Sequence, residues 1–313
     1  MASTPAVAGT AVRARQSSGL WRDAWSRLRR NRLALVGLVG VFLLALAAVF
    51  GPMIAPYPYQ EQDLKAIAAN GFRPLPPGSP GHLLGTDQLG RDILSRLLDG
   101  AQISMTVALV VQFVVLFIGV PIGAAAGWMA GRVDSFLMRF TDVIYAFPDL
   151  LFIILLSVTL HDTPLGQAMN GLLLVFIAIG LTSWVTVARL VRGQMLSLKE
   201  TEFVEAAKAI GVSDRNIVTR HLLPNGSGPI IVAITLGIPG AILAEATLAY
   251  IGIGVQPPRA SWGTLIAEGQ KFIRSDPHLV FFPAVCIALA LVCFTFLGDG
   301  MRDALDPKLK GKQ

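Results

Sequence analysis

Long apolar runs, separated by shorter polar stretches, dominate the chain from residue 33 onward. An apolar run of about 20 residues is long enough for one helix to cross a lipid bilayer. Six runs of about that length cover residues 33–54, 103–127, 142–160, 171–191, 229–253 and 279–297. The pattern therefore predicts an all-α polytopic membrane protein with six transmembrane helices.

The third run is the least regular of the six. Arg139 and Asp142 stand three residues apart near its start, where they can pair on one helix face. Pro148 interrupts the pattern before a purely apolar stretch. We predict one span over 142–160, with its polar start buried among the other helices.

The regions before and after the spans divide the chain further. Residues 1–19 are predicted to be a disordered tail because they are rich in small and polar residues. Residues 20–32 predict a basic amphipathic helix, with Trp21, Trp25 and Leu28 at helical spacing, that suits an anionic lipid surface. This helix, the first span and a long loop form a unit over 20–101. A core over 102–301 and a tail over 302–313 follow.

Charge decides the orientation. Charged residues make up only 15% of the chain against 53% hydrophobic residues, and the net charge is +6. Basic residues accumulate at the cytoplasmic ends of membrane spans. Most of them lie in the two tails and between the fourth and fifth runs. We therefore expect cytoplasmic termini, external loops over 57–101 and 254–278, and no nucleic-acid partner.

The first external loop predicts a second short helix. Thr86 or Asp87 is placed to cap a helix in which Leu89, Ile93 and Leu97 share one face. Such a helix would lie on the membrane surface, with the charged residues around it forming an ordinary solvated surface.

The polar stretch 201–225 predicts a helical hairpin. Thr201 is placed to cap its first helix, and Gly211 most easily takes the left-handed conformation that ends a helix. Ser213 or Asp214 can cap a second helix that runs to Pro224.

An apolar stripe at helical spacing runs along the first of these helices, through Phe203, Ala206, Ala207 and Ile210. A compact hairpin with such a stripe suggests a docking element, and the alternative is a solvated connection between spans. Lys199 lies just outside the hairpin, where replacement is expected to be mild.

Glu245 is the informative residue of the fifth run. A carboxylate in mid-span costs about 2.5–3.5 kcal/mol on insertion scales, so it should face protein or water. It is a candidate for the wall of a translocation path, and equally for an acid that bonds a neighbouring helix. No second acid stands at helical spacing in the same run, which disfavours a proton relay.

Catalytic motifs are missing from the sequence. It contains no Gly-x-x-x-x-Gly-Lys-Ser/Thr, Gly-x-Ser-x-Gly or His-Glu-x-x-His pattern, and its four histidines lack metal-ligand spacing. We expect no enzyme activity, no metal site and no catalytic residue in this chain.

Three parts of the hairpin together resemble a known family. Glu205-Ala206-Ala207, Gly211 and His221-Leu222-Leu223-Pro224 are similar to the EAA loop of ATP-binding-cassette importer permeases. That family usually has an aliphatic residue where this chain has His221, although the peptide-moving branch accepts histidine there. The run 85–92, Gly-Thr-Asp-x-x-Gly-Arg-Asp, and Ser261-Trp-Gly also resemble the C-type permease of dipeptide and oligopeptide importers.

The resemblance implies the type I importer permease fold, peptide import and a bacterial inner-membrane location. It implies two ATPase subunits, a second permease and an external binding protein as partners. ATP and Mg would be used by the ATPases, and this chain would bind no cofactor. The residues implied in docking and coupling are Glu205, Ala206, Ala207, Gly211, Leu223 and Pro224.

Two alternatives remain open at this point. Importers of nickel and other small solutes share this permease type. A proton-coupled secondary transporter would also be polytopic with a membrane acid, but it would usually show internal repeats, and none is evident.

Overall fold

The computed structural model describes residues 20–306, so the expected tail over 1–19 and the last residues of the other tail, 307–313, lie outside it. The regular structure of the described part is helical. Its α-helices are α1 Leu20–Leu28, α2 Arg32–Ile54, α3 Leu64–Ala69, α4 Ile93–Met129, α5 Gly131–Ala146, α6 Asp149–Leu160, α7 Pro164–Gln167, α8 Leu172–Lys199, α9 Glu202–Ala209, α10 Asp214–Asn216, α11 Leu223–Asn225, α12 Ser227–Tyr250, α13 Trp262–Gly269 and α14 His278–Leu305. A π-helical segment, η2 Ile217–Leu222, joins α10 to α11, and the 3₁₀ turns η1 Ala168–Gly171 and η3 Gln270–Phe272 follow α7 and α13.

Five helical segments of the described chain are long and apolar enough to cross a membrane. They are α2, α4, α8 with α7, α12 and α14. The pair α5 and α6 makes a sixth if it counts as one span, although its two halves are bent by 79°. The apolar runs therefore predicted the membrane helices well, with one exception.

That exception is the third run, where a single span over 142–160 is the wrong description. The helix begins at Gly131 and breaks at Phe147, whose backbone is extended (φ −79°, ψ 134°). Proline disfavours helical backbone in the residue before it, and Pro148 follows directly. Asp142 pairs with Arg189 of α8 at 2.6 Å, across 47 residues, where the sequence suggested Arg139.

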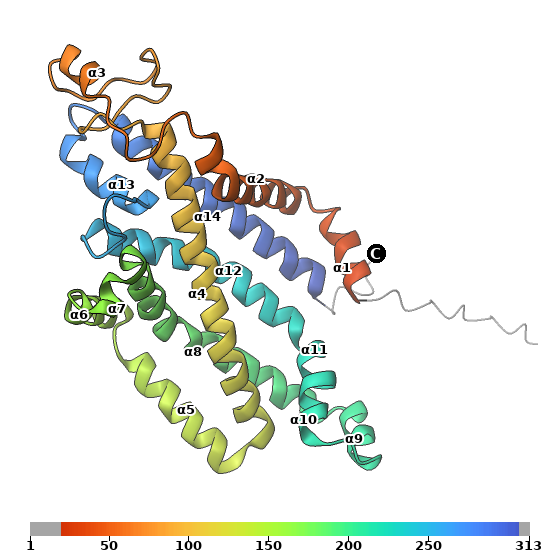
Figure 1. Cartoon of the computed structure of the whole chain (residues 1–313). Coiled ribbons are helices and arrows are strands. Elements are labelled where there is room, and N and C mark those ends of the chain that lie inside the picture. The colour runs from red at the N-terminus through yellow and green to blue at the C-terminus, as the bar shows by residue number, and fades with distance from the viewer. Residues whose placement is uncertain (1–19, 307–313) are drawn as a thin grey trace, which may run out of the picture.

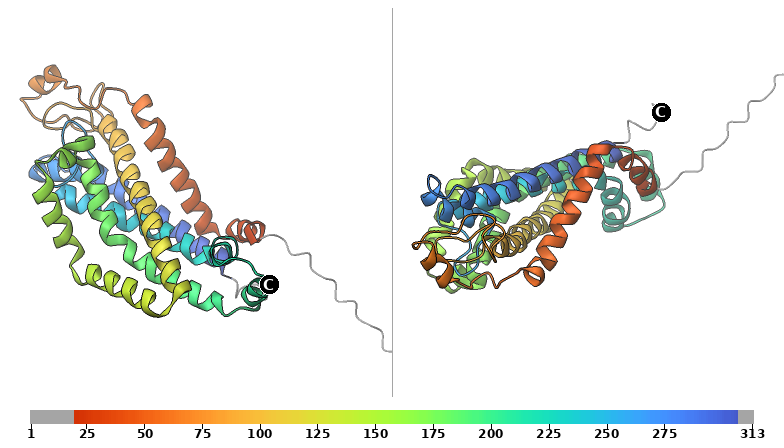
Figure 2. Two further views of the ribbon diagram at one scale, coloured as in Figure 1. Left: turned by 60° about the horizontal axis from the view of Figure 1, so that its bottom comes forward. Right: turned by 90° about the horizontal axis from the view of Figure 1, so that it is seen from above.

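The molecule is elongated and has two different ends (Figure 1). We call the end with α3, the loop 55–92 and α13 the loop end. The opposite end, with α1 and α9–α11, is the hairpin end, and the views in Figure 2 agree on this arrangement. The two segments with distinctive sequence motifs therefore lie at opposite ends of the helical bundle.

Helices α4 and α8 form the closest pair of the bundle. Gly119, Gly123 and Gly127 are spaced four residues apart along α4 and face α8. A Cβ atom at Gly127 would lie 2.5 Å from the Cβ of Met195, and one at Gly123 would collide with the Ala188 carbonyl. Small residues at this spacing let helix backbones approach closely, so the two helices cannot shift freely against each other.

The basic helix α1 is present, but part of its apolar face packs on protein. Ala24 and Leu28 are buried against Ala304 near the end of α14. Arg27 donates hydrogen bonds to the carbonyls of Ala304 (3.4 Å) and Asp306 (3.1 Å), which suits a cation at a helix C-terminus. The predicted lipid contact of Leu28 is therefore wrong.

The short surface helix predicted before the second span is also wrong. Its residues from Ile93 onward form the first turns of α4, a helix of 37 residues. Asp92, not Thr86 or Asp87, caps this helix by accepting from the Ser95 amide at 2.8 Å. Leu89 precedes the helix and is exposed.

Candidate functional site

The hairpin 201–225 opens with α9, which begins directly after α8. Thr201 holds the N-cap position, but its hydroxyl donates to the Leu198 carbonyl at 2.6 Å and caps no amide of α9. The predicted side-chain cap is therefore wrong. Glu202 and Glu205 lie in the first turn, where negative charge complements the helix dipole.

Gly211 ends α9 as expected, with φ +78°. Its amide donates to the Lys208 carbonyl (3.0 Å), and the Val212 amide donates to the Ala207 carbonyl (3.0 Å). These two bonds form a Schellman motif, which a left-handed residue closes. Gly211 therefore sets the direction in which the chain leaves α9.

The second half of the hairpin is a longer helical stretch than predicted. Ser213 holds its N-cap position without a side-chain bond. The chain continues through α10, η2 and α11, so Pro224 does not stop it. Proline lacks an amide and its ring crowds the carbonyl four residues earlier, and the wider π turn directly before it accommodates the ring. Gly226 follows as the break before α12.

The faces of α9 divide the docking candidates. Glu205 and Ala206 are exposed, as is Ala209 one turn further on, while Ala207 is buried with Val204 against the rest of the chain. The structure thus assigns Ala207 to internal packing. In the second half, Leu223 is half-buried against the core, whereas Pro224 is exposed. The six candidates therefore do not share one surface. Glu205 and Ala206 lie on the exposed face of α9.

The substitution Gly211→Val tests the hairpin geometry. A Cβ at Gly211 would meet nothing within 4 Å, so the expected cost of about 1–2 kcal/mol comes only from the left-handed backbone. We expect normal membrane insertion, with either weaker co-purification of an ATPase or hydrolysis without uptake. Gly193→Val on α8 is the matched control, because a Cβ there also meets open space on ordinary helical backbone. Equal behaviour of the two variants would contradict the role of the turn.

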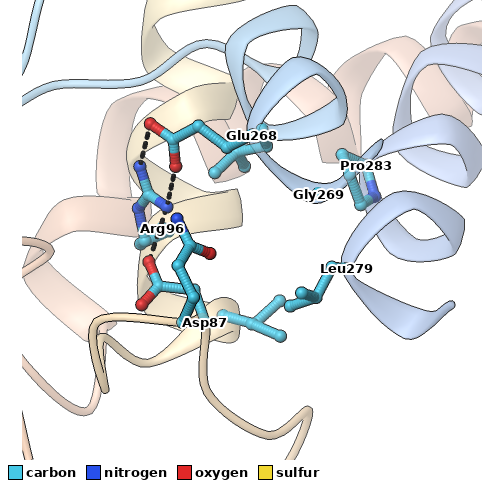
Figure 3. Close-up of a pocket in the computed structure, with 9 residues that line it drawn as sticks. Asp87, Arg96, Glu268, Gly269, Leu279 and Pro283 are labelled. Carbon is cyan, nitrogen blue, oxygen red and sulfur yellow. Dashed lines mark hydrogen bonds and ion pairs between the residues drawn. The ribbon is translucent and has the colours of Figure 1, made fainter. Parts of the chain in front are cut away.

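A buried network of charged side chains occupies the loop end. Arg96 of α4 lies 2.7 Å from Asp87 and 2.7 Å from Glu268 of α13. Figure 3 shows the Arg96 side chain between these two carboxylates. Arg91 binds the same two carboxylates at 2.6 and 3.1 Å. The network closes one side of a small cavity that Gly269, Leu279 and Pro283 line on the other. It joins the loop 55–92, α4 and α13 into one unit.

Three further contacts fix this unit to the bundle. His82 is buried and its Nδ1 lies 3.0 Å from Asp92, the residue that caps α4. The Trp262 indole of α13 donates to the Leu97 carbonyl of α4 at 3.1 Å. A Cβ at Gly263 would lie 2.5 Å from the Ala246 Cα, so α13 also packs closely on α12.

The interpretation of this region as a solvated surface is therefore wrong. Asp87 and Arg96 are each 3% exposed, and a buried charge is stable only when it is paired and hydrogen-bonded. Sequence reasoning missed Arg96 and Glu268 because these two partners are 172 residues apart. It missed His82 because Asp92, its partner, lies among charged residues that were interpreted as a solvated surface. The signal in the sequence was the distinctive run 85–92, which contains Asp87 and Arg91.

Glu245 lies on α12 beneath the start of α13 and is 1% exposed. The hydroxyls of Ser104 and Ser261 are its polar neighbours, yet neither carboxylate oxygen has a hydrogen-bond partner among the described residues. Its helix face is opposite to the exposed face of Leu243, Thr247 and Tyr250. The Glu245 carboxylate is thus buried from solvent within the chain in this conformation.

The variant Glu245→Gln is expected to leave assembly and transport intact and to keep or raise the thermal midpoint. Glutamine has almost the same shape as glutamate and cannot ionise, so the variant avoids the cost of burying a charge without a partner. Uptake and thermal stability of the purified complex check this. Glu61→Gln, at an exposed carboxylate of the loop end, is the control and should change neither. A loss of uptake in a stable complex would instead place the carboxylate on the solute path.

The comparisons with known proteins agree with this arrangement. The family model "Binding-protein-dependent transport system inner membrane component" matches residues 119–311, which is more than half of the chain. The chain belongs to this family. A second model, "N-terminal TM domain of oligopeptide transport permease C", matches residues 19–77. The chain is therefore a multi-pass membrane transport component and not the catalytic subunit of such a system.

Relatives of this permease are similar along almost their full length. The oligopeptide transport system permease protein OppC of Escherichia coli (strain K12) is 43% identical over 94% of this chain and 93% of its own. The dipeptide transport system permease protein DppC of Bacillus subtilis (strain 168) is 42% identical over 95% and 88%. Membership of this family contradicts the alternative that the chain is a proton-coupled secondary transporter, because such proteins belong to a different class of transporter.

A solved structure supports the fold alone. An inward-facing form of the MetNI methionine ABC transporter matches with a TM-score of 0.55 and 16% identity, over 66% of this chain and 94% of that one. The importer permease fold implied by the sequence motifs is therefore confirmed.

Proposed function

We propose that this chain is the permease subunit of an ATP-driven importer that moves dipeptides or oligopeptides into a bacterial cell. The observation that carries the proposal is the similarity, at 41–43% identity over 94–95% of this chain, to oligopeptide and dipeptide transport permeases. The structure supports it with a compact hairpin at one end of the bundle and a folded loop unit at the other.

The proposed partners follow from these two ends. The complete importer would contain two ATP-binding-cassette ATPases, and the hairpin end of this chain would dock on an ATPase subunit. The ATPases would use ATP and Mg, and this chain would bind neither ATP nor Mg. The loop end would receive an external binding protein, and a second homologous permease would complete the path. Basic residues are in excess at the hairpin end. This excess supports an orientation in the inner membrane in which both termini and residues 201–225 face the cytoplasm.

The proposed coupling surface is the exposed part of the hairpin. Ala206 and Ala209 are small and permit a close approach, and Glu205 beside them can accept a hydrogen bond or ion pair from the ATPase. Gly211 holds the angle of the surface through its Schellman bonds. Ala207, Leu223 and Pro224 would support this surface, with Ala207 acting from inside.

The helix α1 is proposed to rest on anionic lipid. Trp25 is 45% exposed, and the Arg29 guanidinium lies 4.7 Å from the centroid of its ring. Exposed tryptophan and arginine side chains are favourable at the headgroup level. This face of α1 is the one not packed on α14.

Uptake by intact cells tests the proposed solute. Cells that lack their own peptide importers would receive this permease with the ATPases, second permease and binding protein encoded beside it. We expect ATP-dependent uptake of labelled dipeptides or oligopeptides that stops when this chain is omitted. Uptake of Ni²⁺ with no peptide uptake would replace the peptide proposal with the small-solute alternative. If the cells took up neither peptides nor Ni²⁺, both the peptide proposal and the small-solute alternative would be overturned.

A further inference from the structure

The indole of Trp128, in the last turn of α4, lies close to two lysines from other helices. The ammonium of Lys199, the last residue of α8, donates to the Trp128 carbonyl at 2.6 Å and lies 5.3 Å from the ring centroid. The ammonium of Lys208, on α9, lies 5.0 Å from the same ring. An ammonium within about 6 Å of a tryptophan ring is attracted to its electron-rich face. Three helices therefore meet at one indole.

These contacts decide how α9 is held. Its N-terminal end is joined to α8 through Glu200 and Thr201. Lys208 lies at the other end of α9, about 9 Å further along at 1.5 Å per residue, and contacts α4. The helix is thus held at both ends, by the chain to α8 and by the lysine to α4, and between them by the burial of Val204 and Ala207. The contact of Lys208 adds resistance to pivoting about the first residues of α9.

The helices that hold α9 form a tight pair. The glycine contacts of α4 with α8 extend to Gly127, which precedes Trp128. A Cβ atom at Gly127 would collide with Met195 and Arg192 of α8. A displacement of α9 that is transmitted to this pair must therefore move both membrane helices together. Without the contact to Trp128, the far end of α9 would lose its link to α4, and more of the same displacement would be absorbed by bending at 200–201.

We propose that Trp128 is a positioning residue that fixes the angle of α9 against α4 and α8, so that movement of a docked ATPase reaches α4. This inference rests on the proposed function. It also predicts that replacement of Lys199 is not mild, because Lys199 contacts the same indole as Lys208.

The first test measures the geometry and is independent of any partner. Spin labels are placed at Met129 and Ala209, both exposed, in the full chain in lipid vesicles. We expect one narrow distance distribution in the otherwise unaltered chain and a broad one after Trp128→Leu or Lys208→Met. Trp128→Phe and Lys208→Arg retain the ring and the cation, so they should restore most of the narrow distribution. An unchanged distribution in the Leu and Met variants would overturn the inference.

The second test measures solute imported per ATP hydrolysed in vesicles with the complete importer. Trp128→Leu and Lys208→Met should each lower this ratio by about two- to fivefold, with normal ATPase retention, and the double variant should be no worse than either. A Lys208→Met variant that loses the ATPase while Trp128→Leu has no effect would show direct docking by Lys208, and would overturn the inference. Hydrolysis without import by the unaltered complex would instead contradict the proposed function, and leave the distance test to decide the role of Trp128.

Discussion

Arg96→Met is expected to lower the free energy of unfolding by about 3 kcal/mol, because removing one partner of a buried ion pair leaves the other charge uncompensated. Asp87 and Glu268 would keep only Arg91, and α13 would lose its closest charged contact with α4. The value stands at the low end for a buried pair because Arg91 remains and Glu268 is 26% exposed. The thermal midpoint of the purified chain should fall accordingly.

A surface arginine of the same loop end provides the control. Arg73 is exposed, and Arg73→Met should change stability by less than about 0.5 kcal/mol, as for most surface substitutions. If the two variants melted alike, the network of Asp87, Arg91, Arg96 and Glu268 would not hold the loop end together.

Ala206→Trp is expected to release the ATPase from the permease. Ala206 is exposed on the outer face of α9, so a larger side chain leaves the fold unchanged and obstructs only a partner. Overfilling a closely packed contact costs about 1–3 kcal/mol, and about 1.4 kcal/mol is a tenfold change in affinity. ATPase co-purification should therefore fall about tenfold or more, while the permease inserts and melts normally.

Ala69→Trp on α3 is the matched control for this variant. Ala69 is an exposed alanine on a helix of the opposite end, and its replacement should leave ATPase retention unchanged. Normal retention in the Ala206 variant would show that α9 does not carry the docking surface. Ala207→Trp cannot serve in place of Ala206→Trp, because Ala207 is buried and a tryptophan there would test folding and not docking.

Features that depend on local sequence were predicted more accurately than features that depend on contacts between distant segments. The spans are encoded by local apolar runs, and the end of α9 by a single glycine, so both were accessible from the pattern. The kink at Phe147 was signalled by Pro148, but its sharp bend depends on how α5 and α6 pack against α4 and α8. A run that reads as one span therefore became two helices.

The polar elements were harder because their meaning depends on distant partners. From the sequence alone, Asp87 and Arg96 resemble residues of a solvated surface. In the structure both are buried, and Arg96 pairs with the distant Glu268. The faces of α9 were ambiguous for the same reason, since Val204 and Ala207 turn inward only once α8 and the second half of the hairpin are in place. Trp128 carries no motif, and its role appears only when Lys199 and Lys208 meet at its ring.

Photo-crosslinking from position 206 tests the central claim most directly. A photoreactive amino acid at residue 206 of the assembled complex should give a covalent product of the permease with an ATPase subunit, in a yield that changes when ATP is added. The same amino acid at residue 69 should give no ATPase product. An ATPase product from residue 69 and none from residue 206 would contradict the account, because the coupling surface would then lie at the other end of the molecule.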